Sequence, residues 1–411
     1  MIETYRHTLG NGLRVVVHPD SNTVMVALDI IYNVGSRDER PDRTGMAHLF
    51  EHLMFGGSAN VHDFDREVER AGGSNNAWTS TDFTNFYTVV PAVNAETAFW
   101  VESDRMLAPK LTGHPLEIQR QVVVEEFKQV CLNTPYGDLM HHLRPLVYTT
   151  HPYRWPTLGI TPDHVAGATE SDVTSFFNAH YSPGNAVLVV SGNIEPDKAF
   201  ALAEHWFGDI PARATTPRNH PAEPPQTEAR RTEVRDKVPN TLIQIAFPMA
   251  AYGRPGYVEA DIITDILANG QASRLMRDVV AKGDVITRAD TSITGSDEAG
   301  MLLVSAYLND NSPAATERAE RLIRQQLDRL IDTEVGADEL GRCTARFAST
   351  IAFGQMSYLG CATELAQAEM QGEDINTRVD RYRSVTPAMV RTTAATLLRH
   401  ECSNTVIYRP A

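Results

Sequence analysis

The segment GMAHLFEHLMFGGS, residues 45–58, carries two histidines and a glutamate within five positions of an otherwise apolar stretch. These residues are His48, Glu51 and His52. Positions i, i+3 and i+4 share one face of a helix, so the three side chains point the same way if the segment is helical. A buried imidazole or carboxylate needs a partner, because an unpaired polar group in an apolar setting costs several kcal/mol. A divalent metal ion is the simplest partner that satisfies all three groups at once.

The order of these residues is H-x-x-E-H, the inverzincin arrangement. Two imidazoles four residues apart on a helix can present two nitrogen ligands to one Zn²⁺, and the glutamate can accept a proton from a metal-bound water. The alternative interpretation is a solvated helix face with two unrelated histidines. The neighbouring residues disfavour it, since they are Met46, Leu49, Phe50, Leu53, Met54 and Phe55.

A catalytic zinc needs a third protein ligand. The segment QRQVVVEEFKQ, residues 119–129, offers Glu125 and Glu126. Helical spacing places Glu126 on one side with Val122, Val123 and Val130, which favours Glu126 as the inward carboxylate. Five histidines compete for this place, and each is interpreted as a surface or helix-end residue: His62, His114, His141, His142 and His151.

Composition narrows the class of protein. The 411 residues are 42% hydrophobic, which suits two or three domains with real cores. A net charge of −15 does not suggest a nucleic-acid-binding protein. No apolar run is long enough to span a membrane, and the first residues lack the features of a signal peptide. The four cysteines form no C-x-x-C pair. We therefore expect a cytoplasmic protein without a disulfide framework, or a periplasmic one if a leader has been removed.

The chain reads as two α+β halves joined by a linker. We expect a catalytic half over 1–212, a linker rich in proline and charge over 213–234, and a second half over 235–411. In each half a threonine starts a helix that leads into a strand, at Thr169 and at Thr386, which indicates a structural repeat. Each half is expected to be a largely antiparallel sheet covered by helices. The first half predicts strands at 13–17, 24–32 and 84–90, and helices at 45–55, 62–70, 94–107 and 115–147.

Several quoted segments together resemble the pitrilysin family of zinc metallopeptidases, which includes insulin-degrading enzyme and mitochondrial processing peptidase. The resemblance is strong to about residue 195 and looser beyond. Besides the segment at 45–58 it includes LGNGLRVVV, YNVGSRDE, GGSNNAWTSTDFTNFYTVVP, QRQVVVEEFKQ and HPYRWPTLG. The short, mitochondrial-processing-peptidase-like bacterial members are the best match, as the zinc-bearing subunit.

The resemblance implies a role for each matching residue. His48, His52 and Glu126 would hold Zn²⁺, and Glu51 would be the general base. Gln119 stands where relatives have an acidic residue that supports the zinc site, so that support would be lost or altered. Asn76 and Ala77 lie in the segment that resembles the active-site edge strand, and they would bind the substrate near the scissile bond.

The second half departs from the family pattern. Active monomeric relatives carry an arginine and, seven residues on, a tyrosine that bind the substrate, and the aligned residues here are Val280 and Thr287. Arg277 and Arg288 are nearby but out of register. We therefore expect a zinc endopeptidase subunit that cleaves peptides or unfolded polypeptides in an enclosed chamber. A homologous partner in a heterodimer would supply the missing pair, with a homodimer as the alternative. The competing functions are a non-catalytic scaffold and a peptide-binding subunit that retains its zinc site.

Overall fold

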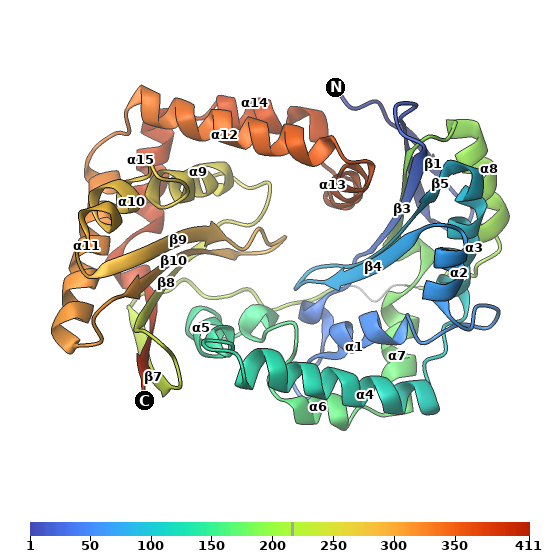
Figure 1. The fold of residues 1–411 in the computed structure, drawn as a ribbon, viewed down its shortest axis with the longest axis horizontal. Helices are drawn as coiled ribbons and strands as arrows, with labels where there is room; N and C mark the ends of the chain where they lie inside the picture. Colours follow the sequence, from blue (N-terminus) through green and yellow to red (C-terminus); the bar gives the residue numbers. More distant parts are fainter. Residues whose placement is uncertain (215–217) are drawn as a thin grey trace. The chain divides into compact units, whose positions relative to one another are not determined.

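The computed structural model describes residues 1–214 and 218–411, which form two compact units (Figure 1). The first unit contains Met1–Lys128, Trp155–His220 and Ile351–Thr377. The second contains Gln129–Arg154, Pro221–Thr350 and Arg378–Ala411. Each unit is a sheet covered by helices, so the predicted α+β fold class with two sandwich-like halves is confirmed. The predicted limits of the halves stay a prediction, because these units group residues by packing and neither is continuous in sequence.

The first unit contains a six-stranded sheet in the order β1-β2-β6-β3-β5-β4. All neighbours pair antiparallel except β2 and β6, which are parallel. Two of the predicted strands, 24–32 and 84–90, are found almost unchanged. The strands are β1 Tyr5–Thr8, β2 Arg14–Pro19, β3 Met25–Tyr32, β4 Ser74–Thr79, β5 Thr84–Pro91 and β6 Ala186–Gly192.

Helices bury one face of this sheet. Alternate residues of β3, such as Leu28 and Ile30, pack into a large apolar core with residues of the covering helices, because successive side chains of a strand point to opposite faces. The helices of this part of the chain are α1 Met46–Leu53, α2 Phe64–Arg70, α3 Ala95–Leu107, α4 His114–Phe127, α6 Pro162–Ala166, α7 Glu170–His180 and α8 Pro196–Phe207.

The second unit contains a five-stranded sheet in the order β7-β11-β8-β10-β9. Its strands are β7 Arg230–Asp236, β8 Leu242–Met249, β9 Ile286–Ile293, β10 Gly300–Leu308 and β11 Asn404–Pro410. The helices of this part of the chain are α9 Tyr257–Leu267, α10 Arg274–Asp278, α11 Pro313–Asp332, α12 Ala337–Gln355, α14 Arg378–Arg383 and α15 Pro387–Leu397.

Apart from β1, which has no counterpart in the second sheet, the two sheets share one topology. In the first, β2 runs parallel to β6, which is followed across the sheet by antiparallel β3, β5 and β4. In the second, β7 runs parallel to β11, which is followed by antiparallel β8, β10 and β9. The predicted repeat matches this order: Thr169 caps α7 before β6, and Thr386 caps α15 before β11.

Each sheet receives one helix from the other part of the sequence. The helix α13, Tyr358–Gln371, follows α12 in sequence but packs on the second face of the first sheet, where Leu365 and Ala366 meet Ala27 and Val189. The helix α5, Leu139–Val147, follows α4 but packs on the second face of the second sheet. Both sheets are therefore covered on two faces, and each unit depends on a segment that the linear order assigns elsewhere.

The predicted single helix over 115–147 is wrong. The helix α4 ends at Phe127, a π-helical turn spans Lys128–Leu132, and α5 begins only at Leu139. Pro135 disfavours helical backbone in the residue before it. Gly137 packs so closely that an added Cβ would lie 1.9 Å from the carbonyl oxygen of Val130. Both residues are turn signals in the sequence, and the prediction of one continuous helix did not take them into account.

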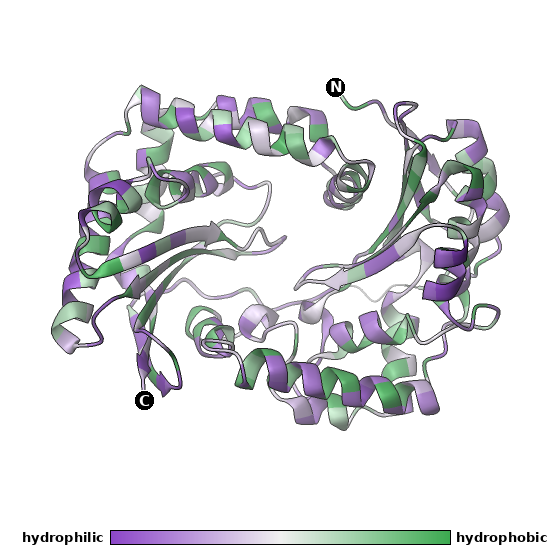
Figure 2. Cartoon of the chain, in the orientation of Figure 1, coloured by the Kyte–Doolittle hydropathy of each residue, from purple (hydrophilic) through white to green (hydrophobic). Residues whose placement is uncertain are grey.

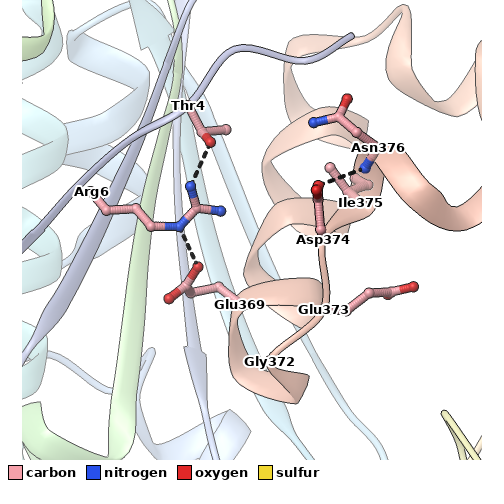
Figure 3. Close-up of a pocket in the computed structure, with 8 residues that line it drawn as sticks. All are labelled: Thr4, Arg6, Glu369, Gly372, Glu373, Asp374, Ile375 and Asn376. Carbon is pink, nitrogen blue, oxygen red and sulfur yellow. Dashed lines mark hydrogen bonds and ion pairs between the residues drawn. The ribbon is translucent and has the colours of Figure 1, made fainter.

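The N-terminal strand and the residues before it are tied to α13 and to the segment that follows α13 (Figure 3). Arg6 on β1 donates to the carboxylate of Glu369 at 2.8 Å. The side chain of Asn376 accepts from the backbone N–H of Ile2 at 2.7 Å and donates to its carbonyl at 3.1 Å. These contacts line a shallow pocket of about 480 Å³ between β1 and the end of α13, and they fasten α13 to the sheet.

The predicted linker over 213–234 includes the beginning of a strand. Residues 215–217 of it lie outside the described residues, but β7 starts at Arg230. This strand has alternating exposure and mostly charged residues, as expected of a strand at the edge of a sheet, and its composition therefore resembles that of a linker. Among the described residues no helix is long and apolar enough to cross a membrane.

Candidate active site

The helix α1 is held at its N-terminus by a buried carboxylate. Glu39 accepts hydrogen bonds from the backbone N–H groups of Gly45 at 2.9 Å and Ala47 at 2.8 Å. These are donors that a helix cannot satisfy internally. Thr44, which directly precedes the N-cap residue Gly45, uses its hydroxyl to contact His164 and to accept from the N–H of Ile160. The capping group therefore comes from outside the local pattern, and no local signal pointed to Glu39.

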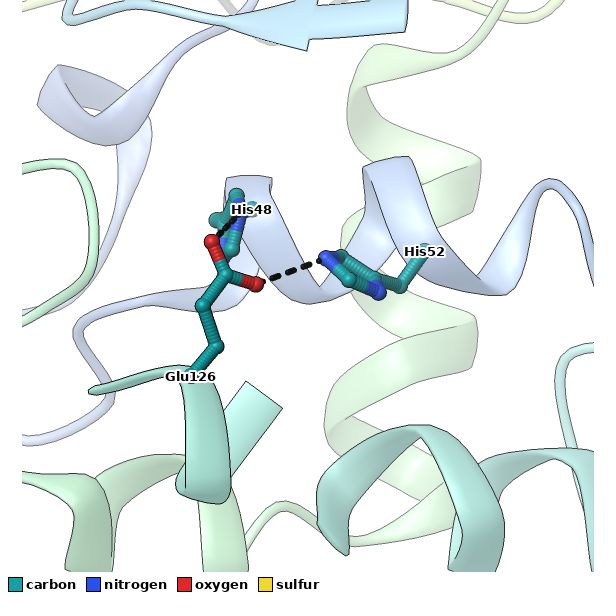
Figure 4. A group of neighbouring side chains, drawn as sticks. All are labelled: His48, His52 and Glu126. Carbon is teal, nitrogen blue, oxygen red and sulfur yellow. Dashed lines mark ion pairs between the residues drawn. The ribbon is translucent and has the colours of Figure 1, made fainter. Parts of the chain in front are cut away.

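The structure brings His48, His52 and Glu126 together (Figure 4). The Nε2 atom of His48 lies 3.6 Å from Oε1 of Glu126, and Nε2 of His52 lies 3.2 Å from Oε2. One ligand atom from each residue lies within 4.8 Å of the others. Two nitrogens and one carboxylate oxygen are the donors of a catalytic zinc site of the His₂Glu type. The role of these residues as metal ligands stays a prediction.

The electrostatics of the three groups suit metal binding. Burial lowers the pKa of His48 to about 4, although the negative charge of Glu126 opposes this. The hydrogen bond with His52 lowers the pKa of Glu126, against the effect of its burial. At neutral pH His48 is therefore neutral and Glu126 is ionised, which are the protonation states that metal ligands require. Nδ1 of His48 is buried and has no hydrogen-bond partner within the described parts of the chain.

Glu51 lies on the same helix, between the two histidines in sequence. Its Oε2 accepts a hydrogen bond of 2.6 Å from the hydroxyl of Thr79, the last residue of β4. Burial raises the pKa of the Glu51 carboxyl, while the Thr79 hydrogen bond and the nearby His52 oppose that rise. A half-buried carboxylate beside three candidate ligands is well placed to hold or move a proton. Sequence reasoning did not single out Thr79, although it lies in the quoted segment GGSNNAWTSTDFTNFYTVVP.

The inward face of α4 differs from the predicted one. Val122 is 43% exposed and Val130 is 40% exposed, so the prediction that they share a buried face with Glu126 is wrong. Leu116, Val123 and Phe127 are buried instead. The apolar run is wider than the face that packs, and hydrophilic and hydrophobic residues alternate around this helix in Figure 2. Glu126 is nevertheless half-buried and turned to the histidines, and Glu125 is exposed and pairs with Lys128 at 2.6 Å.

The competing histidines lie elsewhere. His62 and His114 are exposed, and His142 is half-buried and pairs with Asp138 on its own helix at 2.9 Å. His151 is only 4% exposed, so its interpretation as a surface residue is wrong; its Nε2 lies 2.5 Å from Glu298 in the second unit. Gln119 is half-buried on α4, and no hydrogen bond of its side chain is found among the described residues. Its supporting role stays a prediction.

The strand β4 is the edge of the first sheet next to this centre. It pairs only with β5 in the described residues, which leaves alternate N–H and C=O groups of its other side available. Asn76 is exposed and Ala77 half-buried. The side-chain oxygen of Asn76 accepts from the N–H of Ala77 at 2.9 Å. An extended peptide can add as a further strand to an unpaired edge such as that of β4.

The second unit has no counterpart of the histidine motif. Its corresponding helix α9, with the sequence YVEADIITDIL, contains no histidine. Val280 lies half-buried in a short helical turn, and Thr287 on β9 donates to the carbonyl of Tyr307. The nearby arginines pair locally, Arg277 with Asp278 at 2.8 Å and Arg288 with Asp290 at 2.7 Å. The two aligned positions therefore carry no guanidinium and no phenol.

Comparison with known proteins identifies the family. Residues 14–154 match the family described as Insulinase (Peptidase family M16). Residues 167–347 match its companion, described as Peptidase M16 inactive domain. The chain belongs to the M16 family, the insulinase and pitrilysin group. The predicted resemblance is thereby confirmed, and the inactive-domain match covers much of the unit that lacks the histidine motif.

The relatives within the M16 family are named as proteases. The zinc protease PqqE of Helicobacter pylori is 29% identical over 82% of this chain and 76% of its own length. The mitochondrial-processing peptidase subunit beta of Saccharomyces cerevisiae is 27% identical over 64% of this chain and 57% of its own length. These names support a zinc metallopeptidase of the M16 kind.

Solved structures show the same M16 fold. A protease from Helicobacter pylori superposes with a TM-score of 0.94 at 26% identity, covering all of both chains. A chain of Complex III2 from Candida albicans superposes with a TM-score of 0.82 at 16% identity, covering 99% of this chain and 96% of that one. At that identity the second likeness concerns the fold alone, and one fold can carry different functions.

Proposed function

We propose that this chain is the zinc-bearing catalytic subunit of an endopeptidase that hydrolyses peptides or unfolded polypeptides. The observation that carries the proposal is the position of Glu51: a half-buried carboxylate on the same helix as His48 and His52, with one oxygen already fixed by a hydroxyl. A merely structural metal site has no use for such a group.

The donor set fits zinc. The imidazoles of His48 and His52 and the carboxylate of Glu126 would hold the ion, and the fourth position would be open, as in catalytic rather than structural sites. Zn²⁺ bound there would lower the pKa of a water molecule and polarise the scissile carbonyl.

Glu51 would then act as the general base. It would accept a proton from the attacking water and deliver that proton to the leaving amine. Its free oxygen has open lone pairs for this transfer, because Thr79 occupies only Oε2.

The substrate would bind along β4. An extended segment added to the free edge would be held by main-chain hydrogen bonds, which select conformation more than sequence. Asn76 and Ala77 would flank the scissile bond, since they lie three and two residues before Thr79, the strand residue that contacts Glu51. A peptide or an unfolded segment readily adopts this extended conformation, which supports the proposed substrate class.

A partner subunit would complete the site. Val280 and Thr287 cannot donate to a substrate carbonyl as arginine and tyrosine do. We infer a heterodimer with a homologous chain that carries both groups and closes a chamber around the substrate, with a homodimer as the alternative. The yeast relative is itself named as a subunit.

The competing function is a scaffold or a peptide-binding subunit that keeps its zinc site. The likeness of fold to a chain of Complex III2 is the observation in its favour. Glu51 is the observation against it, because neither a scaffold nor a binding subunit needs a proton acceptor beside the metal.

The substitution Glu51→Gln tests the proposal. The variant should bind one zinc with unchanged affinity and unfold at the same temperature, because glutamine still accepts from Thr79. Its kcat on an unstructured, internally quenched peptide should fall by about 10²–10⁴-fold, the usual contribution of a general base. Zinc content by atomic absorption and cleavage with and without a chelator are measured on the same samples. Cleavage at the wild-type rate would rule out the role given to Glu51.

A further inference from the structure

We propose that Thr79 is a positioning residue for Glu51, and that its hydroxyl couples the edge strand β4 to the catalytic carboxylate. The inference rests on the proposed function of Glu51 as the general base. In the proposed function, β4 binds the substrate by main-chain pairing. The Thr79 hydrogen bond would give β4 a second role, which is to orient the general base.

The contact joins two different elements. Thr79 ends β4, whereas Glu51 lies on α1, 28 residues earlier, and the hydroxyl donates to Oε2 at 2.6 Å. That distance is typical of a charge-assisted hydrogen bond to an ionised carboxylate. Alternation along β4 sets this direction: Ala77, two residues before, packs into the same apolar core as α1. The intervening Trp78 packs into the core on the α13 face of the sheet.

In the part of the chain that the structure describes, the Thr79 hydroxyl is the only hydrogen-bond donor to the Glu51 carboxylate. The terminal torsion of a glutamate side chain has broad, roughly two-fold preferences, so a single hydrogen bond can decide which oxygen points where. With Oε2 held by Thr79, Oε1 is the oxygen left to accept a proton.

A threonine suits this task better than a more mobile donor. Its branched Cβ restricts the first torsion, so the hydroxyl direction is set by the strand backbone. The backbone of β4 is ordered on one side by β5, with Thr79 opposite Thr84. A substrate strand on the other side would order it further. Loss of the hydroxyl should therefore lower kcat, which reports the transition state, and leave KM nearly unchanged.

The chain contains a matched control. Thr88 on β5 donates to Oε1 of Glu102 on α3, also at 2.6 Å, and both residues are buried away from the candidate metal ligands. Thr79→Val and Thr88→Val each exchange a hydroxyl for a methyl and each remove a hydrogen bond to a glutamate. Only the first should affect catalysis.

The experiment compares Thr79→Val, Thr79→Ser and Thr88→Val with the wild type, each with its partner subunit where one is needed. In Thr79→Val we expect kcat to fall about 10–100-fold, the cost of misplacing a catalytic group by about 1 Å, with KM within about twofold and zinc content unchanged. Thr79→Ser should stay within about threefold of the wild type. Thr88→Val should lower the unfolding temperature and leave kcat unchanged.

Crystal structures of the metal-free variants give a readout that does not depend on activity. The Glu51 carboxylate should keep its orientation in Thr79→Ser and should turn or occupy several orientations in Thr79→Val. An unmoved carboxylate and a wild-type kcat in Thr79→Val would overturn the inference, as would an equal loss of kcat in Thr79→Ser, which would indicate packing rather than the hydroxyl.

Failure of the proposed function would look different. A zinc-loaded wild type that cleaves nothing, or a Glu51→Gln variant that cleaves normally, would contradict the general-base role. The crystallographic comparison would still decide whether Thr79 orients the carboxylate.

Discussion

At the scale of single residues, the candidate metal centre depends on which of two adjacent glutamates turns inward. Glu126 meets both histidines, whereas Glu125 pairs with Lys128 at the surface. The two side chains are chemically identical and differ only in direction, so a comparison between them isolates the effect of position.

We predict that Glu126→Gln lowers zinc affinity more strongly than the roughly 10–100-fold that loss of a supporting residue costs, because a carboxamide supplies no negative charge to the ion. Glu125→Gln is the control and should bind zinc like the wild type. Competition with a chromophoric chelator measures both constants. Equal affinities in the two variants would remove Glu126 from the ligand set.

The sequence predicted those site residues whose spacing along one helix is typical of a metal site. Histidines four apart with an intervening glutamate locate His48, Glu51 and His52 without any structure. Glu39 and Thr79 escaped it, because each acts on α1 from a different element and no local pattern links them. Glu126 does face the histidines, as predicted. The argument for it was wrong, however, because Val122 and Val130, which were expected to share its buried face, are exposed.

At the scale of elements, the contact between β3 and α13 contains a buried acid. Asp29 on β3 accepts from the Thr363 hydroxyl on α13 at 2.7 Å and from the side-chain amide of Asn85 on β5. Burial raises the pKa of Asp29 to about 7, although both hydrogen bonds oppose this; the charge of Glu102 adds to the rise. The folded protein therefore keeps this proton to about pH 7, while the unfolded chain releases it near pH 4.

The sign of the effect on stability follows. Between about pH 4 and pH 7 the folded state binds more protons at Asp29, so this residue's contribution to the free energy of unfolding falls as pH rises, by on the order of 4 kcal/mol at most. We predict that Asp29→Asn, which can keep both contacts, flattens the pH dependence and raises the unfolding temperature at pH 8. Thermal unfolding at several pH values measures this. The exposed Asp209→Asn is the control, and identical curves for all three proteins would contradict the prediction.

The limits of several elements were predictable, and the elements against which they pack were not. The predicted strands at 24–32 and 84–90 and the predicted helix at 94–107 nearly match β3, β5 and α3. Residues 24–32 are rich in β-branched side chains, which favour a strand. The break between α4 and α5 was missed although Pro135 and Gly137 mark it in the sequence. The strand β7 was assigned to the linker, because an edge strand of alternating charges looks like a solvated segment. Nothing local in α13 shows that it covers the first sheet.

At the scale of the whole molecule, the topology is repeated but the chemistry is not. Apart from β1, which has no counterpart, the strands of the two sheets follow the same order, and among the described residues only the first unit carries the histidine motif. The positions of Val280 and Thr287 lack the donors that would act on a substrate carbonyl. Under the proposed function, another chain would therefore have to supply the arginine and the tyrosine.

We predict low peptidase activity for the pure, zinc-loaded chain, and a rise of about 10²–10³-fold in kcat/KM on adding a homologous subunit that carries the arginine and tyrosine, the usual range for one lost donor to a developing oxyanion. Titration of the subunit against a fixed amount of chain gives the stoichiometry. A subunit in which both residues are replaced is the control. Full turnover by a rigorously pure single chain would contradict the inference that a partner subunit completes the site.

The late position of α13 in the sequence has a consequence for biosynthesis. The six strands of the first sheet are complete at Gly192, but the helix that covers their second face begins at Tyr358. At ordinary rates of translation that interval lasts on the order of 10 s, during which Ala27, Ile31, Val187 and Val189 have no native cover. The nascent protein thus emerges from the ribosome with a bare apolar surface. Chaperones and slow codons between these two points would be expected to govern its yield.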